Sequence, residues 1–191
     1  MPNHDEPVVY LRPQTTTATN NDNNDDESNI ATTTASCWRL PTIVRDYSMF
    51  ALTGYNPMGE DRDLDSNQKE NRQLKHDLQQ LSNPTPAYIW DSFGFAHDWR
   101  EDGFVVAYNK KDAQAGEAAI IELAKKYQQG AIYGFTPNHD HGNDGDVVSL
   151  LRKTIPAAMK DVEADTVVVA CDKPTEMKYA DVVINSNNNL D

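Results

Sequence analysis

An amphipathic helix whose buried stripe begins with two asparagines is the feature that most restricts how this chain can fold. Between residues 49 and 81 the sequence reads as a strand, a polar loop and then this helix. Steps of four, three, four and three place these side chains on one helical face: Asn67, Asn71, Leu74, Leu78 and Leu81. Three leucines are ordinary there, but a buried amide without partners costs about 1–3 kcal/mol. We therefore expect other polar groups to meet Asn67 and Asn71, and a functional site at that junction.

The apolar segments and the turn signals between them predict one α+β domain. Helices are expected after an N-cap at Asp65 or Ser66 and after Asp112. With the strands, the order becomes that of the split βαβ, ferredoxin-like sandwich (βαββαβ). An extra helix near residues 147–153 and an extra strand at 166–171 are expected to follow it. The four strands of the sandwich are expected at residues 49–55, 87–95, 104–108 and 131–135.

The two ends of the chain differ in composition from its middle. Residues 14–36 are rich in Thr, Asn and Asp and cannot bury enough apolar area to offset their ordering entropy. We therefore expect residues 1–36 and 185–191 to be disordered tails around a single domain at 37–184. Residues 8–11, Val-Val-Tyr-Leu, leave three alternatives open: a short strand, a segment that folds on binding, or part of the tail.

Charge and the absence of certain motifs exclude several classes of partner. Seventeen Lys and Arg against 30 Asp and Glu give a net charge of −13, which argues against nucleic acid and anionic membranes. No apolar run approaches the roughly 20 residues of a membrane helix, and the first residues do not resemble a signal peptide. Cys37 and Cys171 are far apart, which fits a reducing compartment but leaves a single bridge between them open. We expect a cytoplasmic protein that binds a small polar metabolite or a protein partner.

A family resemblance rests on four short motifs in a fixed order. They are a strand ending in Asn56-Pro57, a helix with Asn67 and Asn71, Trp99-Arg100-Glu101 before a strand, and Gln129-Gly130-Ala131 entering another. Over about residues 49–137 this pattern resembles the domain of unknown function 3293 family. The chain departs from it at Asp102-Gly103, where that family more often has Pro-Ser. The resemblance implies a domain boundary and a set of residues, but no activity.

In the expected topology, these motifs meet at one end of the sheet. The loop after the first strand, the start of the first helix and the turn between the second and third strands all lie at that end. So does the junction before the fourth strand. The candidate ligand-binding residues are therefore Asn56, Asn67, Asn71, Trp99, Glu101 and Gln129.

Two interpretations of this cluster stay open. In the first, the amides hydrogen-bond the irregular backbone around Asn56-Pro57 and are structural. In the second, a pocket takes a carboxylate or phosphate at the N-terminus of the helix, with Trp99 as an apolar wall. Catalysis in that pocket would use Glu101 as general base and His97 as proton shuttle.

We expect a non-catalytic binding or regulatory module. The alternative is a small enzyme that acts on a polar or anionic metabolite through Glu101. A third class is an interaction module whose C-terminal strand pairs with another chain.

The remaining polar motifs do not predict a metal or cofactor. His139-Asp140-His141 has the alternation of a metal site, but Gly, Asn and Pro surround it, and such a composition is typical of a solvated loop. The acidic run at residues 61–65 lacks the glycine and distal glutamate of a calcium-binding EF-hand loop. We therefore expect no metal and no cofactor.

Overall fold

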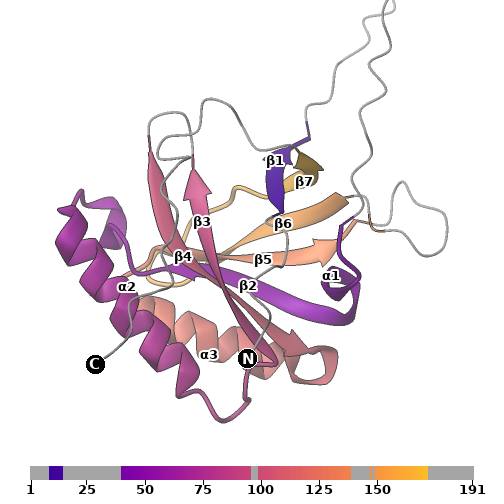
Figure 1. The fold of residues 1–191 in the computed structure, drawn as a ribbon, viewed down its shortest axis with the longest axis horizontal. Helices are drawn as coiled ribbons and strands as arrows, with labels where there is room; N and C mark the ends of the chain where they lie inside the picture. The colour runs from indigo at the N-terminus through magenta and orange to yellow at the C-terminus, as the bar shows by residue number, and fades with distance from the viewer. Residues whose placement is uncertain (1–8, 15–39, 96–98, 139–146, 148, 172–191) are drawn as a thin grey trace, which may run out of the picture.

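The computed structural model describes residues 9–14, 40–95, 99–138, 147 and 149–171. One antiparallel sheet of seven strands runs through this part of the chain (Figure 1). In chain order the elements are β1 (Tyr10–Pro13), α1 (Ile43–Asp46), β2 (Tyr47–Thr53), η1 (Pro57–Gly59), α2 (Leu64–Gln79), β3 (Tyr88–Phe95), β4 (Arg100–Asn109), η2 (Lys110–Asp112), α3 (Ala113–Lys126), β5 (Ala131–Pro137), β6 (Ser149–Pro156) and β7 (Thr166–Cys171). The strand order across the sheet is β1-β7-β6-β5-β2-β4-β3.

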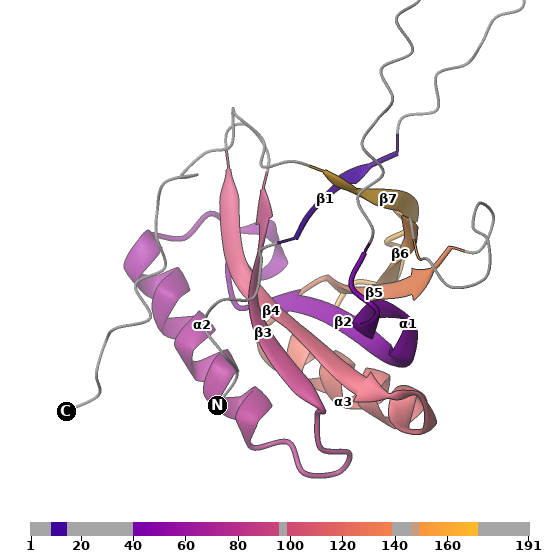
Figure 2. The same cartoon turned by 45° about the vertical axis from the view of Figure 1, so that its right-hand side comes forward.

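The predicted ferredoxin-like sandwich is wrong. From β2 to β5 the elements follow in the predicted order, but β6, β7 and β1 continue the sheet beyond β5. The sheet curls into a half-barrel, so the fold is mostly β rather than a small two-layer α+β sandwich (Figures 1 and 2).

The segment predicted as an extra helix at residues 147–153 contributes to this difference, because Ser149–Pro156 form β6. β6 pairs with β5 on one side and β7 on the other, and Leu150 and Ser149 are buried between them. A short apolar run is compatible with a helix or a strand when it is read alone. Pairing with two neighbours decides the outcome here.

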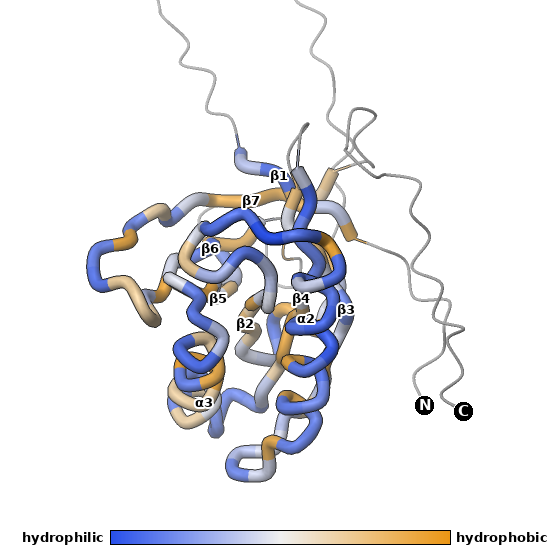
Figure 3. Tube along the Cα trace, turned by 90° about the vertical axis from the view of Figure 1, so that its left-hand side faces the viewer, coloured by the Kyte–Doolittle hydropathy of each residue, from blue (hydrophilic) through white to orange (hydrophobic). Residues whose placement is uncertain are grey.

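The curled sheet has a hydrophobic core on each face. On β4, Phe104, Val106 and Tyr108 pack toward α2 and α3, whereas Val105 and Ala107 belong to the cluster on the other face. That second cluster includes side chains from α1 and from strands across the whole sheet, so it fills the inside of the curl. Figure 3 shows α2 as a mainly hydrophilic helix with few hydrophobic turns, consistent with only one of its faces being buried. None of the described helices is long and apolar enough to cross a membrane.

The curl brings the two edges of the sheet together. β1 and β3 are the first and last strands in the hydrogen-bonded order. The ring of Tyr10 in β1 nevertheless lies 6.1 Å from that of Phe93 and 6.5 Å from that of Phe95, both in β3, in edge-on contacts. Aromatic packing therefore connects the two edges where no strand pairing does.

Tyr108 is the largest fully buried side chain in the described core, and its hydroxyl has no hydrogen-bond partner there. It lies among apolar groups that include Phe50, whose ring centre is 6.3 Å away. Burial raises the pKa of Tyr108 to about 12, because the phenolate would be poorly solvated.

Tyr108→Phe is expected to raise the free energy of unfolding by about 1 kcal/mol, because it removes a buried hydroxyl that lacks a partner. The raised pKa adds a pH dependence in the wild type. Below about pH 10, Tyr108 is protonated in the folded and the unfolded protein, and stability does not change with pH through this group. Between about pH 10 and 12 the unfolded state releases the phenol proton first, so the free energy of unfolding falls. Urea unfolding of both proteins at pH 7 and pH 11 measures both effects. A clear loss of stability in the variant at pH 7 would contradict this account.

Candidate functional site

The chain leaves β2 through an irregular turn. Asn56 adopts a left-handed conformation, with φ 44° and ψ 59°, and Met58 and Gly59 also have positive φ. Asparagine is among the residues that tolerate this region best. Such a turn cannot satisfy its own backbone groups in a regular ladder, so they need partners from elsewhere.

Asn67 in α2 supplies partners for two backbone groups of the turn and for the Asn56 side chain. The backbone N–H of Asn56 donates to Asn67 Oδ1 at 2.9 Å, and Asn67 Nδ2 donates to Asn56 Oδ1 at 2.8 Å. Asn67 Nδ2 also donates to the carbonyl oxygen of Arg62 at 3.2 Å. The residue is only 4% exposed. Asn67, the first residue of the polar stripe predicted for this helix, therefore points inward. Its side-chain oxygen and nitrogen are both hydrogen-bonded to residues of the turn segment.

Asn71, one turn further along α2, binds the start of the same segment. The backbone N–H of Gly54 donates to Asn71 Oδ1 at 3.1 Å. A Cβ on Gly54 would lie 3.0 Å from the backbone nitrogen of Asn71, a very tight contact with helix backbone. Glycine at this position lets α2 rest directly on the end of β2.

Gln129 holds the turn from its other side. Its Nε2 donates to the carbonyl oxygen of Tyr55 at 2.9 Å and to that of Tyr127 at 3.3 Å. The neighbouring carbonyl of Gln128 accepts from the N–H of Met58 at 2.8 Å. Gln129 is 8% exposed, so it lies beneath the turn rather than on an open surface.

Glu101 and Trp99 lie at the outer rim of this cluster. Asn56 Nδ2 donates to Glu101 Oε1 at 2.8 Å, the one hydrogen bond of this carboxylate within the described residues. The indole of Trp99, 46% exposed, packs against Gly94, where an added Cβ would lie 3.3 Å from its ring. Gly94 is the cross-strand partner of Glu101. Since paired residues share a face of the sheet, the indole and the carboxylate lie near each other.

An ion pair that the sequence did not predict lies next to this rim. Arg100 Nε donates to Asp102 Oδ1 at 2.8 Å, its side chain is only 7% exposed, and its guanidinium lies 4.2 Å from the ring centre of Phe93. The backbone of Asp102 also accepts from Thr53 Oγ1 at 2.7 Å. Asp102-Gly103 reads as a turn signal, but both residues are in β4. Residues 100–103 are Arg, Glu, Asp and Gly, without the apolar alternation of a strand, so periodicity gave no signal that the strand begins at Arg100.

Tyr55 is a second residue that the sequence analysis missed. It is 5% exposed, and its hydroxyl lies 3.5 Å from Asp102 Oδ2. Burial and then the nearby carboxylate of Asp102 raise the pKa of Tyr55 to about 12. Tyr55 is therefore a neutral hydrogen-bonding group at physiological pH.

The N-terminus of α2 is capped by Asp63, so the predicted caps at Asp65 and Ser66 are wrong. The N–H of Ser66 donates to Asp63 Oδ1 at 2.9 Å, and Ser66 Oγ donates to Asp63 Oδ2 at 2.7 Å. These hydrogen bonds hold the pKa of Asp63 below its usual value. A carboxylate of the chain thus fills the place where the sequence predicted a ligand's carboxylate or phosphate.

Other candidates lie elsewhere or outside the described residues. His97, Cys37 and the loop His139-Asp140-His141 fall outside them. Within the described part, no three His, Cys, Asp or Glu side chains could hold a metal ion together.

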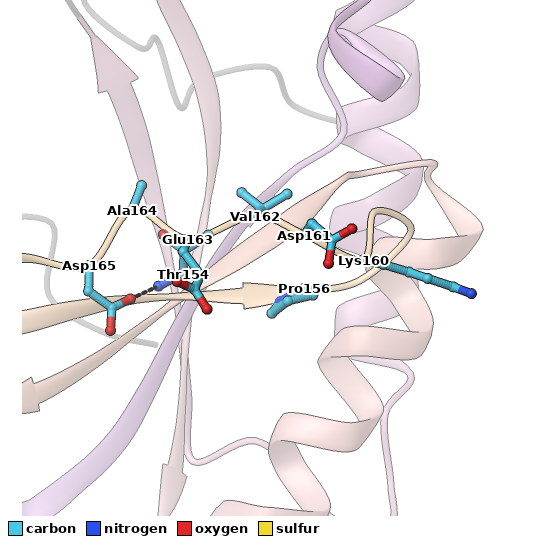
Figure 4. A pocket seen from close by; sticks show the side chains of 8 residues that line it. All are labelled: Thr154, Pro156, Lys160, Asp161, Val162, Glu163, Ala164 and Asp165. Atoms are coloured by element: carbon cyan, nitrogen blue, oxygen red, sulfur yellow. Dashed lines mark hydrogen bonds between the residues drawn. The ribbon is translucent and has the colours of Figure 1, made fainter.

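A hollow of about 900 Å³ lies under the segment between β6 and β7 (Figure 4). There the N–H of Thr154 donates to Asp165 Oδ1 at 2.9 Å, while Lys160 and Val162 point away from β6. This hollow contains none of the candidate site residues. Its lining residues are Thr154, Pro156, Lys160, Asp161, Val162, Glu163, Ala164 and Asp165.

The fold and the site together define a small antiparallel β protein in which buried amides hold one end of the sheet. The model of the family described as "Protein of unknown function (DUF3293)" matches residues 52–132. This segment includes every candidate residue from Asn56 to Gln129, and the predicted resemblance is confirmed over it. Comparisons with curated proteins and with solved structures give no significant match.

Asn67→Leu is expected to lower the free energy of unfolding by about 2 kcal/mol, because it removes the hydrogen bonds from this buried side chain to the part-buried backbone groups of Asn56 and Arg62. Asn71→Leu removes one hydrogen bond and is expected to cost about 1 kcal/mol. Urea denaturation measures both changes.

Gln68→Leu, at an exposed position of the same helix, is the matched control and should change stability little. A rise in stability on Asn67→Leu would show that the amide is not needed by the fold.

Proposed function

We propose that this chain is a binding module without catalytic activity, which takes a positively charged group of a metabolite or protein at the polar end of its sheet. The proposal rests mainly on the position of the Glu101 carboxylate. Asn56 fixes one of its oxygens at 2.8 Å, and the other oxygen has no hydrogen bond within the described residues. The half-exposed indole of Trp99 packs against Gly94, the cross-strand partner of Glu101.

Four features support a cationic ligand. A carboxylate forms strong, charge-assisted hydrogen bonds with ammonium and guanidinium groups, and an indole face attracts the same groups. The net charge of −13 favours the approach of cations over anions. Asp63 already provides the negative charge at the N-terminus of α2.

The same contacts favour binding over chemistry. In general acid–base catalysis a side chain takes a proton from the substrate or gives one to it, and a second side chain nearby often carries the proton onward. The described partner of Glu101 is the amide of Asn56, which cannot relay a proton at ordinary pH. The amides of Asn67 and Gln129 are occupied by backbone groups.

A thermal-shift screen tests the proposal, since a ligand that binds the folded state raises the melting temperature. The probes are putrescine, spermidine, arginine amide and a short Lys/Arg peptide, with citrate and inorganic phosphate as oppositely charged controls. The cations are expected to raise the melting temperature in a concentration-dependent way, and the anions are not. Stabilisation by the anions alone would contradict the proposal.

Glu101→Gln and Trp99→Ala are expected to abolish the shift caused by the cations while leaving the melting temperature of the free protein nearly unchanged. Glu122→Gln, on the exposed face of α3, is the matched control and should keep the shift. An unchanged shift in Glu101→Gln would place the ligand elsewhere. Turnover of a probe that Glu101→Gln abolishes would instead make Glu101 the general base of an enzyme.

A further inference from the structure

β1 is a short strand that belongs to the sheet although it is far from its neighbours in the sequence. Its residues pair antiparallel with β7, from Tyr10 opposite Cys171 to Pro13 opposite Val168. The N–H of Gln14 donates to the carbonyl oxygen of Val167 at 2.8 Å and extends the pairing. Twenty-five residues, 15–39, separate this strand from the next described segment.

Two side chains anchor β1. The ring of Tyr10 contacts Phe93 and Phe95 of β3, and Leu11 packs against the core cluster inside the curl. Arg12 and Pro13 are exposed. The strand therefore makes backbone hydrogen bonds along one edge and inserts an aromatic and an aliphatic side chain on alternate sides.

The surface that receives β1 has the properties of a peptide-binding edge. Without β1, the outer edge of β7 would present unpaired N–H and C=O groups, which readily accept a further strand. Phe93 and Phe95 form the apolar contact for one side chain, and the inside of the curl receives the next. In strand addition, the backbone gives affinity and such alternate side-chain sites give specificity.

We propose that the β7 edge, with Phe93 and Phe95, is a strand-acceptor groove that the chain's own segment Tyr10–Pro13 occupies as an intramolecular ligand. Its partner in trans is an extended segment of another protein that carries an aromatic residue followed by a branched aliphatic residue, as in Tyr10-Leu11. Displacement of β1 by that segment opens the groove. This inference does not depend on binding at Glu101.

The covalent connection explains how the groove stays closed in the free protein. A segment tethered through a linker of this length has an effective local concentration near the millimolar range. A free peptide at micromolar concentration competes poorly with it. Once the connection is cut, the two compete on equal terms.

The test uses the full chain with a specific protease site in place of residues 20–26, folded first and then cut. A fluorescent peptide of residues 7–15 (PVVYLRPQT) is titrated, and fluorescence anisotropy measures its binding. The cut protein is expected to bind it at least about 100-fold more tightly than the uncut protein. A peptide with Tyr10→Ala should lose binding, whereas one with Arg12→Ala, at an exposed position, should keep it.

A variant of the uncut chain provides a second measurement. Tyr10→Ala weakens the tethered strand, so this variant is expected to take up the labelled wild-type peptide without cutting. Equal binding of the two substituted peptides would overturn the proposal. So would absence of binding to both the cut protein and the uncut variant, or formation of dimers that exchange their own β1 strands. Unfolding on cleavage together with no uptake by the uncut variant would make β1 a permanent part of the fold.

Discussion

The pairing of two asparagines, Asn67 on α2 and Asn56 in the turn after β2, is the interaction on which the polar end of this protein depends. Each amide satisfies groups that the other element cannot satisfy alone: a buried helix position needs partners for its carboxamide, and a left-handed turn needs partners for its backbone. Because an orphaned group of either kind is costly in the protein interior, the two features stabilise each other. This pair of side chains therefore fixes the position of the turn after β2.

Three consequences follow for the surrounding structure. The helix lies directly on the end of β2, where Gly54 leaves room for its backbone. Gln129 supports the turn from the segment that leads into β5, so residues far apart in the sequence are joined at one end of the sheet. The Nδ2 atom of Asn56 is left to orient Glu101 toward the surface. The amide network thus positions the Glu101 carboxylate near the Trp99 indole. In our account the amides are structural, whereas the carboxylate and the indole form the proposed binding site.

Helical periodicity was sufficient to place Asn67 and Asn71 on an inward face, and the order of elements was sufficient to bring Gln129 to the same end. The remaining details depended on information that local sequence does not contain. Several acidic residues near the start of α2 can all cap a helix, and only the path of the turn selects Asp63. Asp102-Gly103 has the composition of a turn, yet it lies within β4. The tail-like segment that forms β1 and the run that forms β6 become strands because neighbouring strands pair with them, and that pairing changes a predicted sandwich into a curled sheet.

Native-state hydrogen exchange of the Asn56 backbone amide tests the central claim most directly, because it reports how firmly one loop N–H is held. If Asn67 Oδ1 accepts this proton as a permanent part of the fold, the amide should exchange almost as slowly as that of Val106 in the buried middle of β4. The amide of Asp61, in the exposed stretch before α2, gives the rate expected of an unprotected neighbour. Exchange of Asn56 as fast as Asp61 would contradict the account.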